Sequence, residues 1–401
     1  MPASNTLAAP RPAAVPAGPA ALDIQHRLAT LVPLFAAGAA RHDRDNTFPH
    51  DNIRALHASG LISHALPVAL GGHEASLGEA LHIVRSIARG EASTALVLAL
   101  QYSISSRLGV DSPGWPRELR LRIAHDIVRH GALINALRVE PELGTPVRGG
   151  VPATIARPDR DGWRVSGSKI YSTAAPGLTW MLVLAHSAED SPRVGYWLVH
   201  RDSPGIRIVE DWDHLGMRAS ASHKVVFDEV LVPAGHTLEL QPLGTPPVAD
   251  AHTARWAGVL IPAVYDGVAR AARDWLVDWA ATRTPTNLGR PLASLPRFQE
   301  AVGHIDALLL ANDRLFAGAA DGSIPLHQLG QVKYLATNQA IAAVEKAVEI
   351  SGNPGLSRAN PLERHYRDVL CGRIHAPQND TLLAGAGSIA FAAWSAAHAS
   401  A

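Results

Sequence analysis

Residues 211–233, "DWDHLGMRASASHKVVFDEVLVP", combine a polar turn with a β-strand. Gly216 permits a tight turn, because glycine accepts backbone conformations that other residues disfavour. The guanidinium of Arg218 and the hydroxyls of Ser220 and Ser222 are suited to bind an anion or a carbonyl group. The run "KVVFDEVLVP" has the β-branched residues of a strand and ends in proline. Taken alone, the stretch fits a structural role as well as a functional one.

The chain on either side divides into a helical, a β-rich and a second helical region. Apolar residues recur at three- and four-residue steps from about 22 to 130, which predicts helices. Short β-rich runs separated by turn formers such as "PDRDG" and "DSPG" occupy about 131–242. Long helical blocks in 243–401 predict an antiparallel four-helix bundle, so the fold class is α+β multidomain. Residues 1–21, rich in Ala and Pro, lack the apolar core of a secretory signal and are predicted to form a disordered tail.

Composition narrows the classes of partner. The 36 Lys and Arg residues balance the 36 Asp and Glu residues, which argues against a nucleic acid or an anionic membrane. No run reaches the roughly 18 to 20 apolar residues that span a bilayer. Cys371 is the single cysteine, so an intramolecular disulfide is excluded, and no His/Cys cluster has zinc spacing. We therefore expect a cytoplasmic protein with a small-molecule substrate and no metal.

Residues 211–233 resemble the signature of acyl-CoA dehydrogenases, in which a W-x-x-x-G-M-R-x-S-x-S run precedes a strand ending in V-x-V-P. Other family motifs follow in the family's order. "RVEPELGTP" is similar to the flavin loop T-E-P-x-x-G-S-D, and "SGSKIYSTA" is similar to N-G-x-K-x-W-I-T-N. "RTPTNLGRPLASLPRFQ" resembles R-x-x-F-G-x-x-x-x-x-F-Q with extra residues, and "ISGNPGLSRANPLERHYRD" resembles I-F-G-G-x-G-(x)n-P-x-x-R-x-x-R-D. The resemblance implies an N-terminal helical domain, a central β-barrel-like domain and a C-terminal four-helix bundle.

The resemblance also implies a flavin, FAD or FMN, between the β domain and the bundle, with its phosphates reached by a neighbouring subunit of a homotetramer. An aromatic ring at Tyr171 is suited to stack on the flavin, and the hydroxyl of Thr173 to bond its polar edge. A permanent charge at Arg283 suits a diphosphate. The alternative for each residue is ordinary packing. The family motifs give the flavin-binding residues as Val139, Tyr171, Thr173, Arg283, Phe298 and Gln299.

The chain departs from the dehydrogenases at the catalytic base. An acyl-CoA dehydrogenase removes the α proton of a thioester with a carboxylate, whose pKa burial can raise toward the working pH. In most of the family that glutamate lies nine residues after the arginine of the R-D pair, here Arg367-Asp368, and the position holds Ala376. Some relatives place the base just before the arginine that matches Arg255, where this chain has Ala254. Neither position can take a proton.

His375 stands beside the empty position. Reduced-flavin monooxygenases of the same fold also lack the glutamate and carry a histidine near this point, which His375 resembles. Those enzymes receive reduced flavin from a separate reductase, react with O2 through a C4a-hydroperoxyflavin and transfer one oxygen atom to substrate. An imidazole is suited to such chemistry because it gives and takes a proton near neutral pH. The alternative for His375 is a helix-end residue without a catalytic role.

The sequence therefore favours a two-component flavin-dependent monooxygenase with a flavin reductase as partner. The alternative is an FAD-dependent acyl-CoA dehydrogenase that carries out α,β-dehydrogenation with a relocated base, for which Glu91, Asp250 and Asp380 are the candidates. A third hypothesis is a catalytically silent binding protein on the flavin fold. The candidate substrate-binding residues are Gln101, Tyr102 and Arg255.

Overall fold

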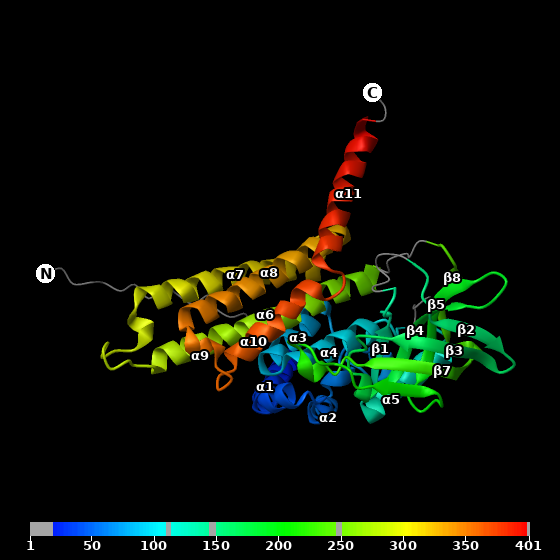
Figure 1. The fold of residues 1–401 in the computed structure, drawn as a ribbon, viewed down its shortest axis with the longest axis horizontal. Coiled ribbons are helices and arrows are strands. Elements are labelled where there is room, and N and C mark those ends of the chain that lie inside the picture. Colours follow the sequence, from blue (N-terminus) through cyan, green and yellow to red (C-terminus); the bar gives the residue numbers. More distant parts are fainter. Residues whose placement is uncertain (1–18, 110–113, 144–149, 246–250, 399–401) are drawn as a thin grey trace.

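The computed structural model describes residues 19–109, 114–143, 150–245 and 251–398 (Figure 1). The first helix begins at Pro19, slightly before the end of the predicted tail, and residues 1–18 of that tail lie outside the described residues. Among the described helices, none combines the length and the apolar character needed to cross a membrane.

The N-terminal part is helical, as predicted. Its helices are α1 (Pro19–Asp45), α2 (His50–Ala58), α3 (Leu77–Gly90), α4 (Ala92–Ser105) and α5 (Arg117–His130). A capping box of Ser76 and Glu79 starts α3. The carboxylate of Glu91 starts α4 by accepting from the backbone N–H groups of Ser93 and Thr94. Residues that are close in sequence therefore define where both helices begin.

The central part is an eight-stranded mixed sheet, at the place in the chain where the central β domain was predicted. The strand order is β6-β7-β3-β2-β4-β5-β8, and β1 pairs with β4 in parallel. Buried alternate residues form its core, in which the rings of Trp163 and Trp197 meet edge to face at 5.5 Å. The strands are β1 (Leu133–Leu137), β2 (Ile155–Asp159), β3 (Gly162–Lys169), β4 (Leu178–Ser187), β5 (Arg193–His200), β6 (Ile206–Val209), β7 (Lys224–Pro233) and β8 (Thr237–Pro242).

The C-terminal part contains the predicted bundle with one difference. The last helical block is not continuous, because residues 375–378 interrupt it, and the segment after the break projects away from the bundle (Figure 1). No residue of that last helix is buried. The helices are α6 (Ala251–Thr282), α7 (Pro296–Asp321), α8 (Leu329–Ser351), α9 (Asn353–Leu356), α10 (Leu362–Ile374) and α11 (Asn379–His398).

Residues 211–217 connect the sheet part to α10 and α1. The carboxylate of Asp368 on α10 accepts from the backbone N–H of Met217 at 2.6 Å. A Cβ added at Gly216 would lie 2.3 Å from the carbonyl oxygen of Arg367, so only glycine fits there. Arg367 bonds both carboxylate oxygens of Asp43 on α1, at 2.8 and 2.6 Å. The signature stretch therefore lies at the junction of all three parts of the chain.

Candidate active site

A buried ion pair anchors the loop that follows β1. The carboxylate of Glu140 accepts from Lys169 Nζ at 2.5 Å, and the two side chains are 2% and 0% exposed. The backbone N–H groups of Ala153 and Thr154 donate to the same carboxylate at 2.6 and 3.0 Å. Burial opposes the charge on Glu140, but the bonds from Lys169 and Thr154 outweigh it and hold the pKa of this carboxyl below its usual range. The loop is thereby fixed to β2 and β3.

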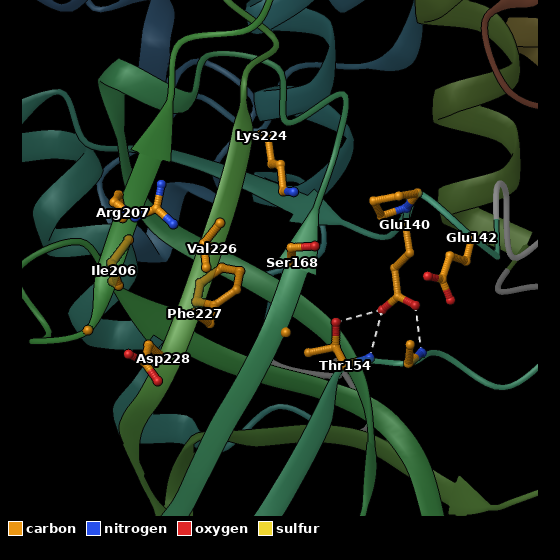
Figure 2. Close-up of a pocket in the computed structure, with 14 residues that line it drawn as sticks. Glu140, Glu142, Thr154, Ser168, Ile206, Arg207, Lys224, Val226, Phe227 and Asp228 are labelled. Carbon is orange, nitrogen blue, oxygen red and sulfur yellow. Dashed lines mark hydrogen bonds between the residues drawn. The ribbon is translucent and has the colours of Figure 1, made fainter.

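A pocket of about 720 Å³ lies beside this loop, on one face of β3, β6 and β7 (Figure 2). Figure 2 shows Lys224 and Arg207 on β7 and β6, with Ser168 of β3 between Lys224 and the loop. Glu142 and Asp228 add carboxylates to the lining. The volume falls in the range of about 300 to 1,000 Å³ that small-molecule sites occupy.

Tyr171, just after β3, presents an exposed aromatic ring. Its side chain is 54% exposed, and its backbone has a φ of 55°, in the left-handed region that residues with a Cβ rarely adopt. The rings of Trp212 and His214 meet it edge-on at 6.2 and 5.9 Å. Strained backbone of this kind gathers at ligand sites. The ring is therefore free to take a planar ligand.

Hydroxyl groups line the segment after Tyr171. Thr173 Oγ1 and Ser222 Oγ are 3.0 Å apart, and Ser222 Oγ lies 2.8 Å from Ser220 Oγ. The side-chain amide of Asn135 on β1 donates to the carbonyl oxygen of Thr173 at 3.2 Å. Val139 joins the same region, since its carbonyl oxygen accepts from the backbone N–H of Ile170 at 3.0 Å. Val139, Tyr171 and Thr173 thus lie on neighbouring segments.

His375 follows the last residue of α10. Its Nδ1 lies 3.0 Å from the hydroxyl of Tyr265, a fully buried residue of α6. Burial raises the pKa of Tyr265, so the phenol is neutral and its O–H needs an acceptor. We therefore assign the hydroxyl as donor to Nδ1, which puts the imidazole proton on Nε2. Burial, with a smaller contribution from Lys333, lowers the pKa of His375 to about 4, so the ring is neutral at pH 7.

The sequence matches the models of the N-terminal, middle and C-terminal domains of acyl-CoA dehydrogenases over residues 32–110, 138–230 and 259–380. The chain belongs to the acyl-CoA dehydrogenase family.

Two kinds of relative occur in this family. YdbM of Bacillus subtilis (strain 168), whose name assigns it to the acyl-CoA dehydrogenases, is 35% identical over 87% of this chain and 91% of its own. The amino sugar nitrososynthase RubN8 of Streptomyces rubradiris is 32% identical over 86% of this chain and 84% of its own. The solved structure of KijD3 with FMN and a dTDP-linked amino sugar is 30% identical, with a TM-score of 0.83 over 94% of this chain and 95% of that one. Acyl-CoA dehydrogenase family members use a flavin.

The described residues fit such a group on their own geometry. The exposed ring of Tyr171 offers a planar contact and the hydroxyl of Thr173 a polar one. The pocket beside the loop adds volume on the adjoining strands, although neither of these two residues lines it. The side-chain oxygen of Gln378, in the turn after His375, is buried without a partner, which indicates a missing donor there.

The other three residues assigned to the flavin lie elsewhere in the chain. Arg283 follows the C-terminal end of α6 and stands over the ring of Trp279. Phe298 is buried against the same Trp279, and the amide of Gln299 donates to the carbonyl oxygen of Ala293. Arg283 is about 48 Å along the helix from the start of α6, because a helix rises about 1.5 Å per residue. Within one chain, these three residues therefore lie far from the loop that contains Val139.

The predicted substrate residues already have partners within the protein. Gln101 on α4 donates to the carbonyl oxygen of Ala132 at 3.2 Å and accepts from the backbone N–H of Ile134 at 2.9 Å. Tyr102 is fully buried, and its hydroxyl donates to the carbonyl oxygen of Leu61. Arg255 donates to the carbonyl oxygen of Ala319 at 2.7 Å, at the end of α7. Substrate contact by the three residues stays a prediction, and the bonds seen here are structural.

Two residues near His375 were not predicted. Tyr265 lies in a run of buried residues on α6, so nothing in the sequence separates it from the core. Lys333 is 3% exposed on α8, and its ammonium donates to Asn379 Oδ1 at 3.2 Å. Lys333 follows Leu329 by four residues, on the apolar face of the helix. A lysine on the apolar face of a predicted helix could have indicated a buried charge at this position.

The described residues contain one group that could hold a metal ion, although the sequence predicted none. The ligand atoms of His125, Asp126 and His130, near the end of α5, lie within 4.8 Å of one another. One oxygen of Asp126 also accepts from Trp180 Nε1 at 3.1 Å. The three residues are one, four and five positions apart on one helix, and this spacing differs from that of a His/Cys zinc motif.

Acid is expected to destabilise the protein through two buried histidines, His64 and His365, and the half-buried His375. Burial lowers the pKa of His64 and His375 to about 4 and that of His365 to about 3. The pKa of a histidine in the unfolded chain is about 6.5. Below that pH the unfolded chain therefore binds protons at these histidines while the folded chain does not. Burial raises the pKa of Asp368 to about 7, which acts in the opposite direction and offsets one histidine. Between pH 6 and pH 5 the free energy of unfolding should fall by roughly 2 to 3 kcal/mol.

Urea unfolding at a series of pH values measures this dependence. His365→Leu should weaken it by about one proton, or roughly 1.4 kcal/mol per pH unit, while the exposed His26→Leu should leave it unchanged. A free energy of unfolding that is flat from pH 7 to pH 5 would contradict the neutral state of these three rings.

Proposed function

We propose that this protein is a flavin-dependent monooxygenase that oxygenates a small molecule with O2 and reduced flavin. The observation that carries the proposal is His375, oriented by the hydroxyl of Tyr265 and beside Ala376, where the dehydrogenases carry their base. Bound reduced flavin supplies the electrons that activate O2. Val139, Tyr171 and Thr173 would hold the flavin.

His375 holds a proton at Nε2 in this proposal. Because Tyr265 occupies Nδ1, the Nε2–H is the donor left for a ligand oxygen. An ionised carboxylate in the same place would repel an oxygen that gains negative charge. A neutral N–H donor stabilises such an oxygen without repulsion.

Helix α4 excludes water from the other side of the site. Val97 and Leu100 of α4, together with Leu133 and Leu178, line a narrow space against Asn135 and Thr173. Val97 is 4% exposed, so this wall is packed. A dry wall strengthens the hydrogen bonds made inside the site and limits wasteful reaction with water.

The carboxylates considered for a relocated base favour the monooxygenase further. Glu91 is engaged by the N-terminus of α4 and also accepts from Thr94 Oγ1 at 2.6 Å. Asp380 is exposed and accepts from the backbone N–H of Thr381 at 2.8 Å. Asp250 lies outside the described residues. Neither Glu91 nor Asp380 is placed as a free base near His375.

The second candidate function is acyl-CoA dehydrogenation, which two observations support. YdbM carries that name. Asp368 is buried, and burial raises the pKa of its carboxyl to about 7, the range of a general base. Its Oδ1 already accepts a hydrogen bond from the backbone N–H of Met217 at 2.6 Å. This position favours a structural role for Asp368.

A second copy of the chain is part of the proposal. Arg283, Phe298 and Gln299 lie at the far end of the bundle, so a neighbouring subunit would supply them to the flavin phosphates. We propose a homotetramer on this ground, with a separate flavin reductase as partner. Sedimentation of the flavin-loaded protein, compared with Arg283→Ala, tests the assembly and the role of Arg283 separately.

Two reactions of the purified protein decide between the candidate functions. With chemically reduced flavin and ¹⁸O₂, a panel of amines and sulfides, including a nucleotide-linked amino sugar of the kind bound by KijD3, should give products that contain one ¹⁸O atom. Anaerobic mixing of the oxidised protein with a panel of acyl-CoAs should leave the flavin absorbance unchanged. Rapid bleaching by an acyl-CoA would establish the dehydrogenase instead, and failure to bind flavin at all would establish the silent binding protein.

A further inference from the structure

Lys333 is a buried cation without an acidic partner among the described residues. Its ammonium has three N–H groups, and one of them reaches Asn379 Oδ1 at 3.2 Å. The other buried lysine, Lys169, is paired with Glu140 at 2.5 Å. Burial alone lowers the pKa of Lys333 to about 8, and no carboxylate contributes. A charge left unpaired in this way is costly, so it needs a reason.

The position of Lys333 on α8 gives that reason. One turn after it, Thr337 approaches Gly372 of α10, where an added Cβ would lie 3.1 Å from the ring of Tyr265 and 3.3 Å from Thr337. Shortly before it, Gly330 meets Leu382 of α11. The turn that carries His375 therefore crosses α8 at Lys333. The charge of Lys333 acts on the imidazole and disfavours its protonation.

Few other ionisable groups face this pair. Tyr265 on α6 is neutral, and it bonds the imidazole. On α10, Cys371 is a protonated thiol, because burial raises its pKa to about 12, and Asp368 is held by Met217. On α11, Asp380 accepts from its own helix at Thr381. The local cation is therefore carried by Lys333 and not by His375.

We propose that Lys333 is a positioning residue of the His375 site: its unpaired ammonium adds to burial in keeping the imidazole a neutral N–H donor, and it offsets negative charge on a ligand oxygen. The inference rests on the proposed function. It specifies that the site binds a ligand oxygen that carries negative charge. Lys333 acts through the field of its charge and through His375. The proton of His375 stays on the ring.

This arrangement has a pH signature that a charged histidine would not have. A protonated His375 as the cation would make activity fall as pH rises through about 6.5. Lys333 as the cation makes activity fall only as pH rises through about 8. The fall should vanish in Lys333→Arg, because a guanidinium stays charged. In Lys333→Met the rate should be about tenfold or more lower, without this fall.

A measurement on the flavin-free protein tests the same inference without activity. The rate of hydrogen exchange at the C2 carbon of His375, followed by mass spectrometry against pH, reports the pKa of that ring. Lys333→Met should raise this pKa by up to about one unit, because a cation is removed while the burial of the ring remains. Lys346→Met is the matched control, since Lys346 is on the same helix and pairs with Glu349 at 2.6 Å near the surface. It should leave the pKa of His375 unchanged.

The outcomes separate this inference from the proposed function. An unchanged pKa of His375 in Lys333→Met, or an activity profile that falls near pH 6.5 in the wild type, would overturn the role of Lys333 even if oxygen is transferred. A raised pKa in Lys333→Met with no oxygen transfer to any substrate would uphold the role of Lys333 in setting the ring's charge and overturn the monooxygenase. If Lys333→Met does not fold, the wild-type profile and Lys333→Arg still decide the matter.

Discussion

Lys169→Met is expected to lower the free energy of unfolding by about 3 to 5 kcal/mol, the cost of leaving one member of a buried ion pair alone. The remaining carboxylate of Glu140 would be 2% exposed, with only the N–H groups of residues 153–154 and the hydroxyl of Thr154 to bind it. Urea unfolding measures the loss. Because Glu140 fixes the loop that contains Val139, flavin affinity should also fall by about tenfold, which a fluorescence titration measures.

Two variants control for this prediction. Lys224→Met, at the rim of the pocket in Figure 2, removes a lysine that has no such pair and should change stability by less than about 0.5 kcal/mol. The double change Lys169→Met with Glu140→Gln removes both charges while an amide oxygen still accepts from residues 153–154, and it should recover part of the lost stability. If Lys169→Met alone matched the wild type, the pair would not be the anchor of the loop.

His375→Ala should reduce oxygen transfer by about 10² to 10³-fold while flavin binding is retained, which is the range for loss of a positioned proton donor. Consumption of O2 should continue and yield hydrogen peroxide, because electrons still reach O2 without a directed transfer. The measurement is the amount of oxygenated product formed for each O2 consumed. Equal coupling in His375→Ala and the wild type would remove His375 from the chemistry.

Tyr265→Phe is the matched variant for that prediction. It keeps the buried ring and removes only the hydroxyl that bonds Nδ1 at 3.0 Å. Without this bond the two neutral tautomers of His375 become available, and about tenfold of the coupling should be lost. An exposed histidine on the 3₁₀ turn before α8, His327, serves as a neutral control. His327→Ala should behave as the wild type.

The fold followed from local patterns that the chain carries in short segments. The apolar periodicity located the N-terminal helices, and the turn formers separated the strands. The motif around Gly216 indicated the family before any contact was known. Such signals depend on residues that are neighbours in sequence, so they can be recognised without knowledge of the tertiary structure.

Helix faces and helix breaks were less predictable. Gln101 and Tyr102 looked available to a ligand, but packing turned both toward the protein, where backbone groups of strand β1 and of Leu61 bind them. The last helical block broke at His375, because the chain there turns across α8. An Ala-rich helix continues equally well in either direction by propensity alone, so the break depends on contacts with other helices.

The sequence by itself determined the order of helices and sheet, the family and the absence of a carboxylate at Ala376. Only the tertiary structure decided which groups surround His375, and it separated Arg283 from Tyr171 by the length of a helix. Lys169 and Glu140 are 29 positions apart, Tyr265 and His375 are 110, and Arg367 and Asp43 are 324. The periodicity of a sequence indicates only which residues three or four positions apart share a face of a helix. Pairs far apart in the chain form when folding buries their polar groups together, and these pairs set the charge at the site.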